Sequence, residues 1–164
     1  MAERTAVYAG SFDPITYGHL DIIKRAVTMF DHIIVAVARN YEKQALFSAE
    51  ERVALVKEVV PPNLNVEVES FEGLLVEYMK RKGARIILRG LRATSDFDYE
   101  YHMASMNREL NGQIDTVFMV TGKDYFFISS RTVREIASLG GSVKDLVPGM
   151  VAHRLREKFS TVNS

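Results

Sequence analysis

The residues best suited to chemistry stand near the N-terminus, in the stretch Gly10 to His19 (G-S-F-D-P-I-T-Y-G-H). Two glycines and a proline let this backbone turn sharply and leave N–H groups unpaired. A helix that begins near Gly18 directs its free N–H groups and the positive end of its dipole at the turn, which favours a bound phosphate. Ser11 and His19 add side-chain donors there. A lone histidine at a helix start is also a common capping residue, so this segment alone leaves both an anion site and an ordinary strand-to-helix turn open.

Two further segments carry groups that suit phosphates. Arg89-Gly90-Leu91-Arg92 follows an apolar run, and its two guanidiniums can bind phosphate oxygens in pairs. Ser129-Ser130-Arg131 opens a later helix, where hydroxyls either cap the helix or hold a phosphate. Solvated arginines and plain helix caps are the competing interpretations. Lys43 and Glu100 also have ordinary explanations, as a surface lysine and as an acid near a helix start.

The composition excludes several other chemistries. The 164 residues contain no cysteine, which removes disulfides, thiolate metal sites and cysteine nucleophiles, and the four histidines are too far apart for paired metal ligands. Basic and acidic residues both number 21, so no overall positive charge favours nucleic acid. The P-loop, G-x-G-x-x-G and G-x-S-x-G patterns are missing. We find no leader-like or membrane-spanning stretch, and we therefore expect a cytoplasmic protein with neither nucleic acid nor membrane as a partner.

Apolar patterns predict the elements that position these groups. Short apolar runs predict strands at Thr5–Ala9, His32–Ala38, Arg85–Leu88 and Thr116–Val120, and an alternation of apolar and polar residues predicts one more at Asn65–Ser70, five in all. Helical spacing predicts a helix after Gly18 with Val27 and Phe30 on its apolar face, then helices at Ala49–Val60, Leu74–Arg81 and Ser95–Leu110, and later ones from Ser129 and Gly149. Ser48 and Glu51 predict a capping box for the second helix, and Gly83 predicts a glycine cap for the third.

This alternation predicts an α/β protein with a doubly wound, five-stranded parallel sheet of the Rossmann-like type. We expect one domain over residues 1–164, with a last helix at about 149–160 and residues 161–164 frayed. In such folds, ligands bind beyond the carboxyl ends of the strands, where the strand order reverses. The Gly10 turn and the Arg89 segment both follow strands, so both are expected to face one crevice.

The chain resembles the bacterial phosphopantetheine adenylyltransferases, a branch of the nucleotidyltransferase superfamily. The resemblance covers essentially the whole chain and rests on the order and spacing of G-S-F-D-P-I-T-Y-G-H at Gly10–His19, R-G-L-R-A at Arg89–Ala93, D-x-x-Y-E ending at Glu100, N-R at Asn107–Arg108, F-I-S-S at Phe127–Ser130 and R-E at Arg134–Glu135. Thr16 stands where other branches have the first histidine of H-x-G-H. The chain departs from the family at Arg131, where many members have a third serine, and at Tyr17, where asparagine is frequent.

The resemblance implies a nucleotidyltransferase fold and transfer of AMP from ATP to 4'-phosphopantetheine, giving dephospho-coenzyme A and pyrophosphate in the penultimate step of coenzyme A synthesis. The acceptor's own phosphate would attack in line, without a covalent enzyme intermediate. Mg²⁺ that accompanies ATP without direct protein ligands, a homohexamer and feedback binding of coenzyme A are implied as well. Two alternatives stay open: transfer to another phosphorylated acceptor, such as nicotinamide mononucleotide or glycerol phosphate, and a flavodoxin-like regulator that binds a nucleotide without chemistry. Thr16 and R-G-L-R speak against the first.

The same resemblance implies roles for individual residues. His19 would stabilise the transition state, with Arg92 and Lys43 beside it. ATP would be bound by Ser11, Phe12, His19, Gly90, Leu91, Arg92, Glu100, Tyr125, Phe126, Phe127, Ile128, Ser129, Ser130 and Arg131. The 4'-phosphopantetheine would be bound by Ser11, Lys43, Leu75, Arg89, Asn107 and Glu135.

Overall fold

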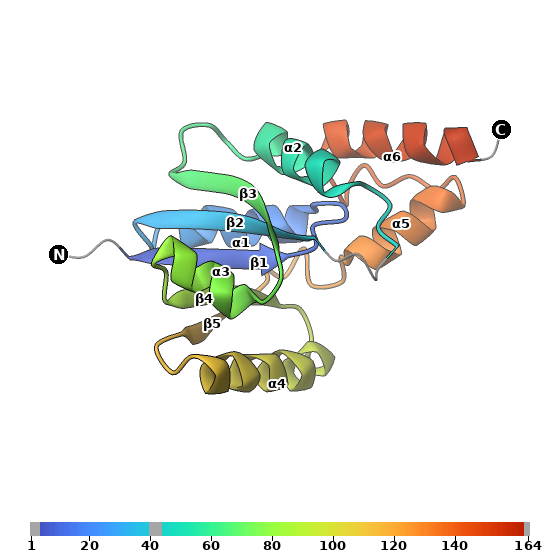
Figure 1. Cartoon of the computed structure of the whole chain (residues 1–164). Helices are drawn as coiled ribbons and strands as arrows, with labels where there is room; N and C mark the ends of the chain where they lie inside the picture. The colour runs from blue at the N-terminus through green and yellow to red at the C-terminus, as the bar shows by residue number, and fades with distance from the viewer. Residues whose placement is uncertain (1–3, 40–43, 163–164) are drawn as a thin grey trace.

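The computed structural model describes residues 4–39 and 44–162, which fold into a parallel sheet with helices on both faces (Figure 1). The strands are β1 (Thr5–Gly10), β2 (His32–Arg39), β3 (Val66–Glu72), β4 (Ile86–Leu91) and β5 (Asp115–Val120). The helices are α1 (Tyr17–Ala26), α2 (Ala49–Val59), α3 (Leu75–Lys82), α4 (Thr94–Leu110), α5 (Ser130–Ser138) and α6 (Gly149–Val162). The strand order is β3-β2-β1-β4-β5, and each neighbouring pair is parallel. The doubly wound five-stranded sheet predicted from the sequence is confirmed.

The central strand β1 is apolar on both sides because each of its faces is covered. Ala6 and Tyr8 face one buried cluster, to which α1, α2, α5 and α6 contribute side chains. Val7 and Ala9 face a second cluster on the side of α3. This burial on both faces explains why the strand reads as a continuous apolar run rather than an alternating one.

Several local signals are confirmed. Ser48 and Glu51 form the predicted capping box at the start of α2, with both of its hydrogen bonds present. Gly83 ends α3 in the left-handed conformation, at φ 65°, which a glycine adopts without steric cost. Helix α2 stops at Val59, before Pro61, as a proline requires.

Most predicted boundaries differ from the structure by one or two residues, and two differences are larger. Helix α1 ends at Ala26, so Val27 and Phe30 lie beyond it; the Thr28 hydroxyl donates to the Arg25 carbonyl at this end. Strand β4 continues to Leu91, because its last three residues pair with β5. Helix α6 extends to Val162, two residues beyond the predicted end at about residue 160, and the predicted fraying at the terminus stays a prediction because residues 163–164 lie outside the described residues. In the described part of the chain, none of the helices has the length and apolar character needed to span a bilayer.

Strand β1 lies between β2 and β4, and this is where the chain changes direction across the sheet. The helix that follows β1 covers one face, whereas α3 and α4 lie on the other, as Figure 1 shows. A crevice therefore opens beyond the carboxyl ends of β1 and β4, the position where doubly wound sheets bind ligands.

Candidate active site

The turn between β1 and α1 holds His19 in one orientation. Thr16 is the N-cap of α1, and its backbone N–H donates to His19 Nδ1 at 3.0 Å, while the His19 N–H donates to Thr16 Oγ1 at 3.4 Å. This is a capping box in which histidine takes the place usually held by glutamate or glutamine. Because a backbone N–H can only donate, Nδ1 must be the acceptor, and the ring proton is assigned to Nε2. Nε2 is thus a hydrogen-bond donor.

His19 is uncharged at neutral pH. Burial, reinforced by the charges of Arg92 and Arg89, lowers the pKa of its imidazole to about 3. The ring packs edge-on against Phe12, with 5.0 Å between centroids. The site therefore contains a neutral N–H donor rather than an imidazolium.

A cavity of about 480 Å³ is lined by residues of all three segments that suit phosphates, Gly10–His19, Arg89–Arg92 and Ser129–Arg131. We call it the His19 cavity. Its lining includes, among the residues expected to bind ATP, Ser11, Phe12, His19, Gly90, Arg92, Glu100, Ile128, Ser129, Ser130 and Arg131. Phe12 lines the cavity although only 2% of its surface is exposed. Groups separated by more than 100 residues in sequence thus surround one space large enough for a nucleotide.

The cationic and hydroxyl groups of this cavity are held by neighbouring residues. The Arg92 guanidinium pairs with Asp96 at 3.2 and 3.3 Å. The Ser129 hydroxyl caps α5 by accepting from the Thr132 N–H at 3.0 Å, and Ser130 Oγ donates to the Pro14 carbonyl at 2.7 Å. Ser130 therefore joins the start of α5 to the β1–α1 turn, and the N-termini of α1 and α5 both line the cavity.

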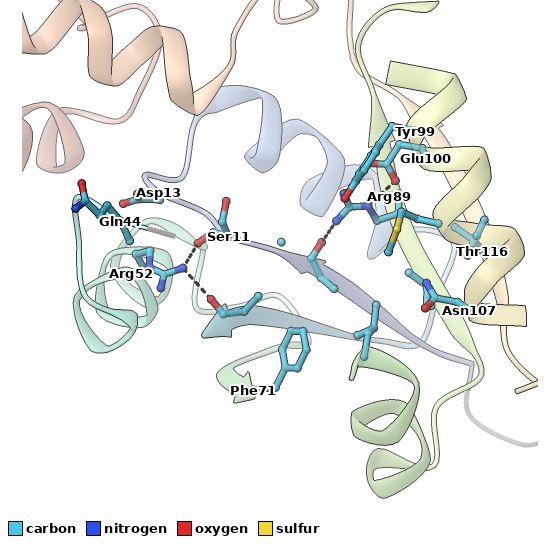
Figure 2. A pocket seen from close by; sticks show the side chains of 18 of the residues that line it. Ser11, Asp13, Gln44, Arg52, Phe71, Arg89, Tyr99, Glu100, Asn107 and Thr116 are labelled. Atoms are coloured by element: carbon cyan, nitrogen blue, oxygen red, sulfur yellow. Dashed lines mark hydrogen bonds and ion pairs between the residues drawn. The ribbon is translucent and has the colours of Figure 1, made fainter. Parts of the chain in front are cut away.

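A second cavity of about 430 Å³ lies on the face of the sheet covered by α3 and α4; we call it the Asn107 cavity (Figure 2). Of the residues expected to bind phosphopantetheine, it is lined by Ser11, Leu75, Arg89 and Asn107. The two cavities share Ala9, Gly10, Ser11, Arg89, Tyr99, Glu100 and Arg134. They meet at the end of β1, so two ligands can be bound side by side.

Arg89 stands at this junction and is paired. Its guanidinium contacts both carboxylate oxygens of Glu100, at 2.8 and 2.5 Å, and also donates to the Ala9 carbonyl (Figure 2). Glu100 is buried, with 8% of its surface exposed. The pair orients one cationic fork toward the meeting point of the two cavities.

Asp13 was not singled out by the sequence analysis, although it lies inside the Gly10–His19 motif. Its buried carboxylate accepts from the N–H groups of Leu46 and Phe47, at 2.9 and 3.0 Å. Arg134 of α5 donates to the Asp13 carbonyl and lies 3.5 Å from its carboxylate. Asp13 thus ties the turn both to the segment before α2 and to α5.

Arg52 was missed as well. This buried residue of α2 donates to the carbonyls of Ser11 at 2.6 Å and Ala38 at 3.0 Å, as Figure 2 shows, and to that of Phe47 at 3.1 Å. Arg52 thus holds the backbone of the β1–α1 turn through the Ser11 carbonyl. The partners of Asp13 are all distant in the chain, and Arg52 has only Phe47 and Ser48 as near partners, so neither residue gives a local sequence signal for the turn that it holds.

The structure does not bring every expected residue into the two cavities. Leu91, Tyr125, Phe126, Phe127 and Glu135 are outside both linings, and the rings of Phe126 and Phe127 are exposed. Lys43 lies outside the described residues.

A doubly wound sheet with two joined cavities at its switch point, both lined by arginines, is the arrangement typical of nucleotide-binding α/β proteins. Residues 7–136 match the family model described as Cytidylyltransferase-like. A solved structure described as a candidate nicotinate-nucleotide adenylyltransferase from Vibrio parahaemolyticus superposes with a TM-score of 0.68 over 98% of this chain and 93% of that chain, at 14% identity. At that identity the likeness shows the fold alone.

Closer relatives narrow the class. A phosphopantetheine adenylyltransferase from Geotalea daltonii is 52% identical over 160 residues, covering 98% of this chain and 99% of that protein. One from Caldanaerobacter subterraneus is 53% identical over 156 residues, covering 95% and 98%. The chain therefore belongs to the Cytidylyltransferase-like family and, within it, to the phosphopantetheine adenylyltransferases.

Proposed function

We propose that this chain transfers AMP from ATP to 4'-phosphopantetheine, releasing pyrophosphate and dephospho-coenzyme A. The observation that carries the proposal is the junction of the two cavities at Gly10, Ser11 and Arg89, which lets a nucleotide and a second phosphate meet. High identity to relatives named for this activity, over nearly their full length, supports the same conclusion.

The acceptor brings its own nucleophile, a phosphate oxygen, so the enzyme needs no catalytic base. Its task is to hold two anions in line and to stabilise the charge that develops on the α-phosphate. His19 suits this task because its Nε2–H is a neutral donor fixed by Thr16. A neutral donor stabilises developing charge and does not transfer its proton to the phosphates. Arg92 and the N-termini of α1 and α5 supply the positive potential for the triphosphate.

Ser11 and Arg89 are placed to bind the acceptor's phosphate, since both line the two cavities. Leu75 and Asn107 line only the Asn107 cavity and would contact the acceptor's arm. The pairing with Glu100 sets the direction of the Arg89 guanidinium, leaving its charge close to the junction.

Mg²⁺ is proposed to enter with ATP, bound through the phosphate oxygens, where it neutralises charge on the triphosphate. Within residues 4–39 and 44–162, no three histidine, aspartate or glutamate side chains are grouped as metal ligands. The acids that line the His19 cavity, Asp96 and Glu100, are paired with Arg92 and Arg89. Homohexameric assembly, feedback by coenzyme A and a cytoplasmic location stay predictions from the resemblance.

The test is a panel of acceptors scored by pyrophosphate release from ATP and Mg²⁺. We expect release with 4'-phosphopantetheine and none above background with nicotinamide mononucleotide or glycerol phosphate. Release with one of the other acceptors alone would assign the enzyme to a different branch of the superfamily. Tight ATP binding without release from any acceptor would indicate a nucleotide-binding regulator.

A further inference from the structure

Thr116 of β5 carries an unexplained polar atom. Its Oγ1 is closed off from solvent and has no hydrogen-bond partner, and among the described residues it is the only buried side-chain nitrogen or oxygen in this condition. A buried hydroxyl without a partner costs about 1–3 kcal/mol relative to a satisfied one. An isosteric valine would avoid that cost, so the hydroxyl is expected to serve something other than stability.

The position of Thr116 indicates what it serves. In the sheet, Thr116 pairs with Ile87, two residues before Arg89, and all three side chains line the Asn107 cavity. Two residues of strand correspond to about 7 Å, so Thr116 lies deeper along the sheet face than the phosphate end of the cavity. Figure 2 shows Thr116 beside Asn107, away from Ser11.

The part of the Asn107 cavity around Thr116 is lined by polar but uncharged groups. The hydroxyl of Thr116 and the carboxamide of Asn107 line it together with the apolar side chains of Ile87, Met103 and Ala104. The Asn107 side chain likewise has no hydrogen-bond partner among the described residues. Such a lining suits an amide, which needs a donor and an acceptor in apolar surroundings, rather than a second phosphate or a carboxylate.

We propose that Thr116 is a specificity-determining residue for the acceptor, and that its hydroxyl bonds with an amide of the acceptor's arm. This rests on the proposed function, which places that arm in the Asn107 cavity. Rotation of χ1 between staggered positions exchanges Oγ1 with the methyl group and turns the hydroxyl into the cavity. The stability lost to an orphaned hydroxyl in the free enzyme is recovered when the acceptor binds.

The experiment compares Thr116→Val, Thr116→Ser and Thr28→Val in steady-state kinetics and thermal unfolding. Thr116→Val is expected to raise the KM for 4'-phosphopantetheine about three- to tenfold, the loss of one hydrogen bond, with the KM for ATP unchanged. Its Tm should rise by about 2–4 °C, because the orphaned hydroxyl is gone. Thr116→Ser keeps the hydroxyl and should keep the KM for the acceptor. Thr28→Val is the matched control at a hydroxyl that is bonded to Arg25 and lines neither cavity.

Several outcomes overturn the proposal. An unchanged acceptor KM in Thr116→Val means that the hydroxyl has no ligand. An equal rise in Thr116→Ser means that packing of the methyl group, not the hydroxyl, is responsible. Should Thr116→Val fail to fold, Thr116→Ala replaces it with the same expected KM. Failure of the proposed function is distinguishable, since the unmodified chain would then form no dephospho-coenzyme A in the same assay.

Discussion

Replacing His19 with glutamine tests the assignment of a neutral, Nε2-protonated imidazole. Glutamine is a usual partner in a capping box and can accept the Thr16 N–H as Nδ1 does, so the turn should survive. Glutamine does not titrate. His19→Gln therefore removes the proton equilibrium while retaining the local hydrogen bond, and any difference in acid sensitivity between the two proteins reports on the histidine.

The direction and size of the expected loss of stability follow from the lowered pKa of His19. An unfolded chain protonates its histidine below pH 6.5, whereas the folded chain resists protonation until about pH 3, so stability that is present above pH 6.5 is lost as the pH falls toward 3. The full shift would cost about 2.6 kcal/mol between pH 7 and 4.5, and because the ring is partly exposed we expect about 1–2 kcal/mol.

Urea denaturation at pH 7 and at pH 4.5 measures this loss. The unmodified chain should lose about 0.5–1 M more in its urea midpoint than His19→Gln does over the same interval. Protonation of carboxylates with lowered pKa values, such as that of Asp31 beside Arg4, reduces the free energy of unfolding equally in both proteins. This contribution therefore cancels in the comparison of the two midpoints. If the two midpoints fall by the same amount, His19 is not held neutral by the fold, and the argument for a neutral donor is wrong.

Two further predictions concern the residues that hold the turn and the junction. Asp13→Ala should lower the free energy of unfolding by about 2–4 kcal/mol in urea titrations, because the N–H groups of Leu46 and Phe47 lose a charged acceptor; a change below about 0.5 kcal/mol would contradict this role. Arg89→Ala should raise the acceptor KM at least about tenfold and also destabilise the chain by leaving Glu100 buried and unpaired, whereas adding Glu100→Gln should restore the stability without restoring the KM. Recovery of both quantities in the double variant would show that Arg89 acts only through Glu100.

Local sequence patterns were sufficient to predict the helices and strands and the edge of the sheet where the candidate site lies. Ser48 with Glu51, and Gly83, are capping signals that depend on residues three or four apart, so they can be recognised without a fold. The apolar strands predicted a doubly wound sheet, and its switch point then brings the Gly10 turn and Arg89 together. The same pattern did not reveal that Thr16 and His19 form a capping box, because histidine is an unusual residue at that position.

Contacts between distant segments account for what the sequence could not predict. The extension of β4 to Leu91 depends on hydrogen-bonding partners from β5, which no local pattern indicates. Arg52 binds the Ser11 carbonyl across 41 positions, and Arg134 reaches Asp13 across 121. The orphaned hydroxyl of Thr116 becomes visible only when α4 and the sheet are in place.

The measurement that tests the account most directly is incubation of the chain with ATP, Mg²⁺ and 4'-phosphopantetheine, followed by mass detection of the products. The two joined cavities predict dephospho-coenzyme A and pyrophosphate in equal amounts, with His19→Gln forming them far more slowly at saturating ATP. Binding of both ligands without any dephospho-coenzyme A would contradict the account, as would full turnover in the His19 variant.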